Sequence, residues 1–131
     1  MIQKKMLIEV GQEKVVALLL EDKAPETCKM IWQAMPLEGP LMHAKICRNE
    51  CFFITRLFPF ERENMILPKP GDIGIFAWRQ SIAVWYDETE PLGPNNIWAK
   101  IVHNLGGFQQ EARKLWTKKQ GTRIKLSRLE G

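Results

Sequence analysis

At 131 residues the chain has the length of one domain, and 19 Lys and Arg against 15 Asp and Glu give it a net charge of +4. Its 45% hydrophobic and 26% charged residues exclude a disordered or collagen-like chain. No run of about 18 apolar residues occurs, and the N-terminus MIQKKMLIEV is charged too early for a signal peptide. We therefore expect a single domain over residues 1–131, located in the cytoplasm.

The cysteines and the basic residues favour no cofactor and no charged partner. An odd number of cysteines (Cys28, Cys47 and Cys51) without a signal peptide predicts free thiols. Cys47 and Cys51 have CxxxC spacing, but a tetrahedral metal site needs four ligands, so we expect neither a metal nor another cofactor. The C-terminal basic residues accompany no nucleic-acid-binding motif, and neither nucleic acid nor a membrane is expected as a partner.

The first third of the chain predicts a hairpin followed by a helix. Lys4–Val10 and Lys14–Leu20 are apolar runs joined by a short glycine-containing loop. Asp22–Met35 places apolar residues at positions i, i+3, i+4 and i+7, the spacing of one helical face. Asp22 or a neighbour can cap this helix, and Pro25 suits its first turn because proline has no N–H to satisfy there.

The middle of the chain predicts four strands. Leu41–Cys47 is expected to be a strand, followed by a tight turn at Arg48-Asn49-Glu50 and a strand over Cys51–Arg56. Residues 57–67 read as a long loop rich in charge and proline. Ile73–Ala77 and Ile82–Tyr86, after a Pro-Lys-Pro-Gly-Asp turn, have the β-branched and aromatic content of a mostly buried pair of strands.

The last third predicts a strand over Ile97–Val102, a helix over about Phe108–Lys119 and a final alternating strand over Thr122–Arg128. The total is about seven strands and two helices with short, mostly antiparallel connections. We therefore predict a mainly β protein, a closed β-barrel with two short α-helices covering its ends.

The order of short motifs along the chain resembles that of the cyclophilins. Residues 22–27, DKAPET, look like the start of their first helix, and Met42-His43-Ala44 lies where that family has a Phe-His-Arg run. Residues 97–105, IWAKIVHNL, are similar to their late strand and the turn into the second helix. The middle of the chain, at Arg48–Glu50 and Pro70–Gly74, looks more like the small bacterial and archaeal cyclophilin-like proteins of unknown function.

The resemblance implies a cyclophilin-like barrel but speaks against the family's activity. Cyclophilins are prolyl isomerases whose arginine hydrogen-bonds near the prolyl amide, and that arginine would fall at Ala44, a methyl group. The family's tryptophan and histidine in the loop before the late strand have no match in residues 90–96. We therefore assign no catalytic residue and expect weak isomerase activity at best.

The leading function hypothesis is a binding module for a small polar molecule or a short peptide. The candidate ligand-binding residues are His43, Glu50, Asn64 and Trp78. The alternatives are structural: His43 as a surface or satisfied histidine, Trp78 as part of the core, and Asn64 as a solvated loop side chain. A degenerate or altered enzyme, either a weak prolyl isomerase or a hydrolase, is the second hypothesis, and assembly into a homo-oligomer through an exposed strand is the third.

Overall fold

The computed structural model describes residues 3–58, 62–76, 79–117 and 122–130. In chain order its elements are β1 (Lys5–Val10), β2 (Glu13–Leu19), α1 (Pro25–Ala34), β3 (Leu37–Pro40), β4 (Met42–His43), the 3-10 turn η1 (Lys45–Cys47), β5 (Arg48–Ile54), β6 (Met65–Ile66), β7 (Asp72–Phe76), β8 (Ser81–Thr89), β9 (Asn95–His103), α2 (Leu105–Arg113), the 3-10 turn η2 (Lys114–Trp116) and β10 (Arg123–Leu129).

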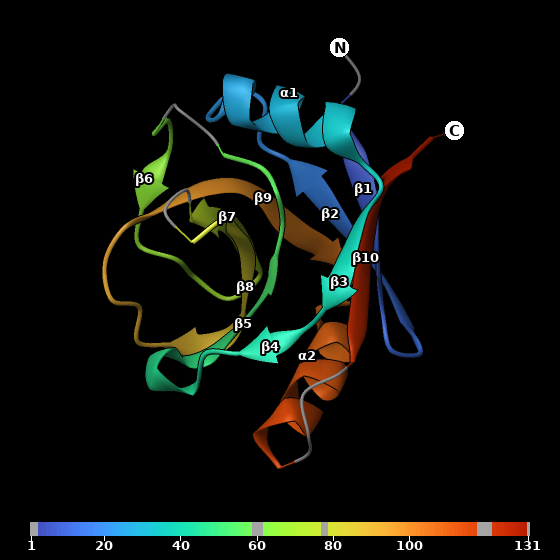
Figure 1. Cartoon of the computed structure of the whole chain (residues 1–131), viewed down its shortest axis with the longest axis vertical. Coiled ribbons are helices and arrows are strands. Elements are labelled where there is room, and N and C mark those ends of the chain that lie inside the picture. The colour runs from blue at the N-terminus through green and yellow to red at the C-terminus, as the bar shows by residue number, and fades with distance from the viewer. Residues whose placement is uncertain (1–2, 59–61, 77–78, 118–121, 131) are drawn as a thin grey trace.

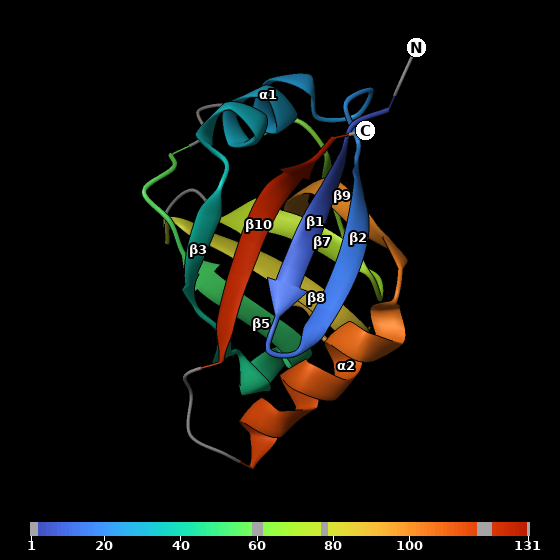
Figure 2. The same ribbon diagram turned by 90° about the vertical axis from the view of Figure 1, so that its right-hand side faces the viewer.

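The strands form one sheet that curls into a nearly closed antiparallel barrel. Nine of them follow the order β3-β10-β1-β2-β9-β7-β8-β5-β4, and β6 pairs with β9 off this path. In Figure 2, β3, β10, β1 and β2 lie side by side in front, and β5, β7 and β8 cross behind them. The strands at the two ends of the path, β3 and β4, follow each other directly in the chain. The predicted mainly β barrel with two helices is therefore confirmed.

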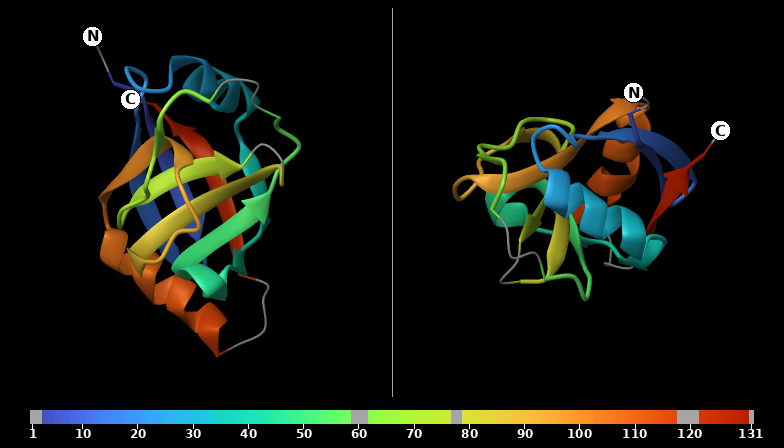
Figure 3. Two further views of the ribbon diagram at one scale, coloured as in Figure 1. Left: turned by 90° about the vertical axis from the view of Figure 1, so that its left-hand side faces the viewer. Right: turned by 90° about the horizontal axis from the view of Figure 1, so that it is seen from above.

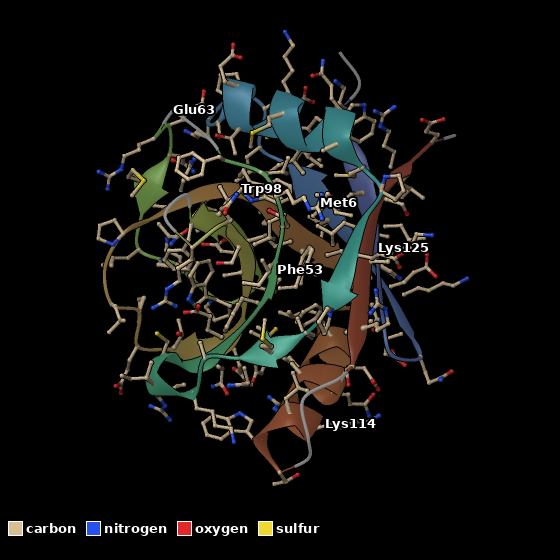
Figure 4. All side chains as sticks on the ribbon, in the orientation of Figure 1. Met6, Phe53, Glu63, Trp98, Lys114 and Lys125 are labelled. Atoms are coloured by element: carbon tan, nitrogen blue, oxygen red, sulfur yellow. The ribbon has the colours of Figure 1, made fainter. Side chains whose placement is uncertain are left out.

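The core fills the inside of the barrel, and the helices cover its two ends (Figure 1). Buried and more exposed residues alternate along β1, β2 and β10, because successive side chains point to opposite faces of a sheet. Met6, Phe53 and Trp98 are fully buried inside, whereas Lys125 points outward (Figure 4). α1 lies across one opening (Figure 3, right), where the Cys28 thiol contacts the Trp98 carbonyl oxygen at 3.3 Å.

The first helix begins later than the sequence predicts. Pro25 occupies its first turn as expected, but the N-cap is Ala24, whose side chain accepts no hydrogen bond. The expected cap by Asp22 or a neighbour is therefore wrong. The second helix also differs: it begins at Leu105 rather than Phe108, because the Asn104 side chain accepts a hydrogen bond from the Gly107 N–H at 3.1 Å.

The largest correction concerns residues 41–56. The expected strand over Leu41–Cys47 is reduced to β4 at Met42–His43, and the chain turns through η1 instead. Arg48 has a left-handed φ of 68°, and β5 begins there rather than at Cys51. The expected tight turn at Arg48–Glu50 is thus wrong, because Glu50 belongs to a strand that pairs with β8. This places its side chain on the wall of the barrel.

Candidate functional site

The barrel wall at β8 is buried on both faces. Every residue from Ser81 to Tyr86 is buried, although only alternate side chains can face the interior. Ala83, Trp85 and Ile97 form a second apolar cluster, separate from the main core. This cluster lies on the outer face of the wall, the face that carries the candidate site.

Glu50 projects onto the same outer face. In the pairing of β5 with β8, Glu50 lies opposite Trp85, and partners in an antiparallel register share a face. Its side chain is only 3% exposed. A pocket of about 220 Å³ opens beside it, lined by residues of η1, β5, β7, β8 and the connection over 91–94. We call this the Glu50 pocket.

The connection from β8 to β9 forms one side of the Glu50 pocket and is held against η1. The Cys47 carbonyl oxygen accepts hydrogen bonds from the Thr89 hydroxyl at 2.6 Å and from the Glu90 N–H at 3.1 Å. The Asn49 amide donates to the Glu88 carbonyl oxygen at 2.6 Å. The gold segment between β8 and β9 runs along this outer face in Figure 3, left. This side of the pocket is therefore held in place by hydrogen bonds to backbone carbonyl oxygens.

The walls of the pocket are mostly apolar, and few charged groups reach it. Phe76 and Trp85 contribute aromatic rings whose centroids lie 6.2 Å apart. The Arg79 guanidinium lies over the Phe76 ring, 5.7 Å from its centroid, and is exposed to solvent. Glu50 is thus a buried carboxyl at the inner end, and Arg79 is a cation at the mouth.

Burial controls the ionisation of the groups in the pocket. Desolvation raises the pKa of Glu50, and interactions with the Cys47 thiol, the Trp85 indole and the Arg79 charge lower it by less. Burial also raises the pKa of Cys47 to about 11, with the Glu50 charge as the second cause. The thiol is therefore protonated at neutral pH and is a poor nucleophile.

The structure does not gather the predicted site residues in one place. Glu50 lies in the pocket. His43 lies near α2, where its Nε2 atom is 2.5 Å from the Tyr86 hydroxyl, which also accepts from the Trp116 indole N–H at 3.0 Å. Burial, and next the Lys45 charge, lower the pKa of His43 to about 4, so it is neutral at physiological pH.

The other two predicted residues lie elsewhere. The Asn64 amide donates to the Ile97 carbonyl oxygen at 2.9 Å, and its N–H donates to Asn96 Oδ1 at 3.1 Å, so it ties the preceding loop to β9. Trp78 lies outside the described residues. Sequence reasoning did not assign Cys47, Arg79 or Trp85 to a site. The sequence carries a signal for Trp85 alone: it lies in the continuous run SIAVWY, which is too apolar for a strand with a solvated face.

Glu63, next to Asn64, caps the first helix from a distant part of the chain (Figure 4). Its carboxylate accepts from the Glu26 N–H at 3.0 Å and from the Thr27 N–H at 2.7 Å. Burial raises its pKa, but these hydrogen bonds outweigh that effect and lower it overall. The carboxylate therefore supplies the cap that Ala24 cannot provide.

Replacing Glu63 with glutamine is expected to lower the free energy of unfolding by about 1 kcal/mol at pH 7, since it removes a charge from a helix N-terminus. Because folding lowers the pKa of Glu63 below its ordinary value of 4.5, the Glu63 carboxylate stabilises the folded state at pH values above 4.5. This stabilisation is lost as the pH falls through the pKa of Glu63 in the folded state. The difference between E63Q and wild type should thus shrink in acid. Urea titrations at pH 7 and pH 3 measure it, with E38Q, on an exposed position of β3, as the control. Equal differences at both pH values would contradict the assignment.

These observations define a nearly closed antiparallel β-barrel with a pocket on the outer face of its wall. The chain belongs to the family described as protein of unknown function (DUF3830), which matches residues 6–127. No curated protein matches the sequence. In the part of the chain that the structure describes, no helix has the length and apolarity needed to cross a bilayer, and no three His, Cys, Asp or Glu side chains group as metal ligands.

Two solved structures share the fold. The structure of McbB in complex with tryptophan is similar with a TM-score of 0.85 and 18% identity over 96% of this chain and 45% of that one. The present chain thus spans less than half of that protein. The solution structure of the hypothetical protein AF2241 from Archaeoglobus fulgidus is similar with a TM-score of 0.67 and 19% identity, over 97% of this chain and 95% of that chain. At these identities the likeness concerns the fold alone.

Proposed function

We propose that this protein is a binding module that holds a small molecule in the Glu50 pocket. The observation that carries the proposal is the buried carboxyl of Glu50 at the inner end of a mostly apolar pocket. Ligand sites typically combine apolar walls with a few convergent polar groups. A buried carboxyl that serves only packing is costly, because burial penalises its charged form.

The size of the pocket favours a small molecule over a peptide. Its volume of about 220 Å³ lies below the range of about 300–1,000 Å³ typical of drug-sized ligands. The structure of McbB in complex with tryptophan gives support of a weaker kind, since part of that protein has this fold. The three cysteines are free and buried, which supports the proposal of a reducing, cytoplasmic location.

The cyclophilin resemblance enters the proposal as a likeness of fold without the isomerase chemistry. Ala44, at the position of the family's arginine, lines the Glu50 pocket with a methyl group. A donor aimed at the reacting centre is worth roughly 3–4 kcal/mol of barrier. Ala44 supplies no such donor, so binding without prolyl isomerisation is the function we propose.

A second candidate is an enzyme that uses Glu50 as a general acid or base. The upward shift in the pKa of Glu50 favours it, because a carboxyl that holds its proton nearer neutral pH can exchange it with a bound substrate. Compounds that bind would then be altered on incubation with the protein, and NMR of the compound distinguishes the two candidates.

Filling the Glu50 pocket with a larger side chain is expected to weaken ligand binding. Ala44→Leu adds three carbon atoms to the pocket wall, so fragments that raise the melting temperature of the wild type should bind this variant at least about 10-fold more weakly, a loss of about 1.4 kcal/mol. Thermal shift and calorimetric titration measure the effect. Ala34→Leu, the same change at a half-buried position of α1, serves as the control and should leave binding unchanged. If Ala44→Leu and Ala34→Leu bind the fragments with equal affinity, the ligand binds outside the Glu50 pocket and the proposal is contradicted.

A further inference from the structure

We infer that the ligand of the Glu50 pocket is a small organic amine, bound as its ammonium ion with the Glu50 carboxylate as counter-ion and the aromatic walls around its apolar part. This inference rests on the proposed function and deepens it. It is carried by three features: the sign of the buried charge, the position of the cation at the mouth, and the aromatic rings beside both.

The buried charge selects the sign of the ligand. Glu50 is 3% exposed, and among the described residues that line the pocket Arg79 is the one cation, exposed at the mouth. A carboxylate taken out of water is stabilised only by a close opposite charge or by strong hydrogen bonds. The Cys47 thiol, the Trp85 indole and the Arg79 charge offset the burial of Glu50 only in part. An ammonium group inside the pocket adds an opposite charge, whereas an anion would be repelled by the Glu50 carboxylate.

The aromatic walls suit the same ligand. Trp85 lies opposite Glu50 in the strand register, and its ring is tilted by 53° to that of Phe76. Cations bind favourably over the faces of tryptophan and phenylalanine rings, and the hydrocarbon part of an amine packs on the same surfaces. Arg79, over Phe76, disfavours a second cation at the mouth but tolerates a neutral or anionic substituent. Monoamines are therefore preferred to diamines.

Binding of an amine is coupled to the proton on Glu50. The groups that face Glu50 are the Cys47 thiol from η1, the Trp85 indole from β8 and Arg79 from the turn after β7, with Cys51 as its neighbour on β5. Burial, opposed by these groups, raises the pKa of Glu50 above the ordinary value of 4.5, and a bound ammonium lowers it again. When an ammonium ion enters the pocket while Glu50 is protonated, Glu50 ionises and its proton is released to the solvent. Affinity should thus rise with pH above 4.5 until Glu50 is ionised.

Calorimetric titration of the full chain with three matched compounds tests the inference. The probes are 2-phenylethylamine, 2-phenylethanol and 3-phenylpropionate, which share the aromatic body and differ in charge. We expect the amine to bind wild type at least 10-fold more tightly than the alcohol, and the acid not to bind. Glu50→Gln should reduce affinity for the amine at least 10-fold, and Glu38→Gln, an exposed carboxylate on β3, should not change it. Two buffers of different ionisation enthalpy at pH 4.5, where a carboxyl with a pKa raised above 4.5 is more than half protonated, should reveal release of protons.

The outcomes separate this inference from the proposed function. Binding of the alcohol or the acid at least as tight as the amine, lost in Ala44→Leu but not in Glu50→Gln, overturns the amine and leaves the pocket as the binding site. Amine binding without proton release, or unchanged in Glu50→Gln, also overturns the inference. If Ala44→Leu leaves the affinity of every compound and fragment unchanged, both the amine inference and the proposed function are overturned. The measurement of proton release uses wild type, so it holds even if Glu50→Gln folds poorly.

Discussion

Replacing Trp98 with alanine is expected to lower the free energy of unfolding by about 3–5 kcal/mol, the cost of deleting a large buried aromatic side chain. Trp98 is fully buried on the inner face of β9, beneath α1. Its carbonyl oxygen accepts from the Leu20 N–H at 2.8 Å and contacts the Cys28 thiol, so a cavity here lies where the helix meets the barrel. Urea or guanidinium titration of both proteins measures the difference.

Two further variants test the reason for this loss. The Trp98 indole N–H is buried without a hydrogen-bond partner in the described part of the chain, so Trp98→Phe removes volume but no hydrogen bond. Trp98→Phe should therefore lower the free energy of unfolding clearly less than Trp98→Ala does. Leu92→Ala, at a position that is 75% exposed, should stay within about 0.5 kcal/mol of wild type. A loss below about 1 kcal/mol for Trp98→Ala would mean that this part of the core is not tightly packed.

Adding a methyl group at Gly74 is expected to destabilise the protein by about 1–3 kcal/mol, the usual cost of overpacking. A Cβ atom there would press on Asn95 Oδ1 and lie 3.0 Å from Trp85 Cζ3 and 3.1 Å from the Asn96 carbonyl oxygen. The strand would gain some stability from replacing a glycine, but a backbone oxygen and a packed ring cannot move aside cheaply. Because Trp85 lines the Glu50 pocket, Gly74→Ala should also weaken ligand binding.

Gly106→Ala provides the matched control for Gly74→Ala. Gly106 lies in α2, and a Cβ atom there meets nothing within 4 Å. Alanine should therefore stabilise the helix by about 0.5–1 kcal/mol. Thermal and chemical unfolding of the two variants should shift in opposite directions. If Gly74→Ala were as stable as Gly106→Ala, the close approach of β7 and β9 at this point would be refuted.

Local patterns in the sequence were sufficient for most of the barrel. The strands around Ile73–Ala77 and Ile82–Tyr86 and the N-terminal hairpin were predicted because β-branched and aromatic runs between turn residues specify strands locally. Helix ends were less predictable. The cap of α1 comes from Glu63, which is 36 residues from Thr27 along the chain, and no local rule detects it.

The candidate site depended on pairing between distant strands. Glu50 was among the predicted ligand-binding residues, but it was expected in a turn, whereas β5 begins at Arg48 and places it opposite Trp85. One residue of register decides whether a side chain faces the core or the outer face, and register is set by the whole sheet. His43 was predicted from a linear resemblance and Asn64 from its place in a long charged loop. Neither observation specifies that these side chains point to Tyr86 and to Ile97.

Because β8 is buried on both faces, substitutions on one face affect the core of the barrel and substitutions on the other affect the surroundings of the pocket. Ile82, Val84 and Tyr86 belong to the main core, whereas Ala83 and Trp85 belong to the outer cluster. Neighbouring codons thus alternate between one set of residues that maintains the fold and another that shapes the surroundings of the pocket. Related proteins could change what they bind by substitutions at every second position of a single strand, while the interior of the barrel stays as it is.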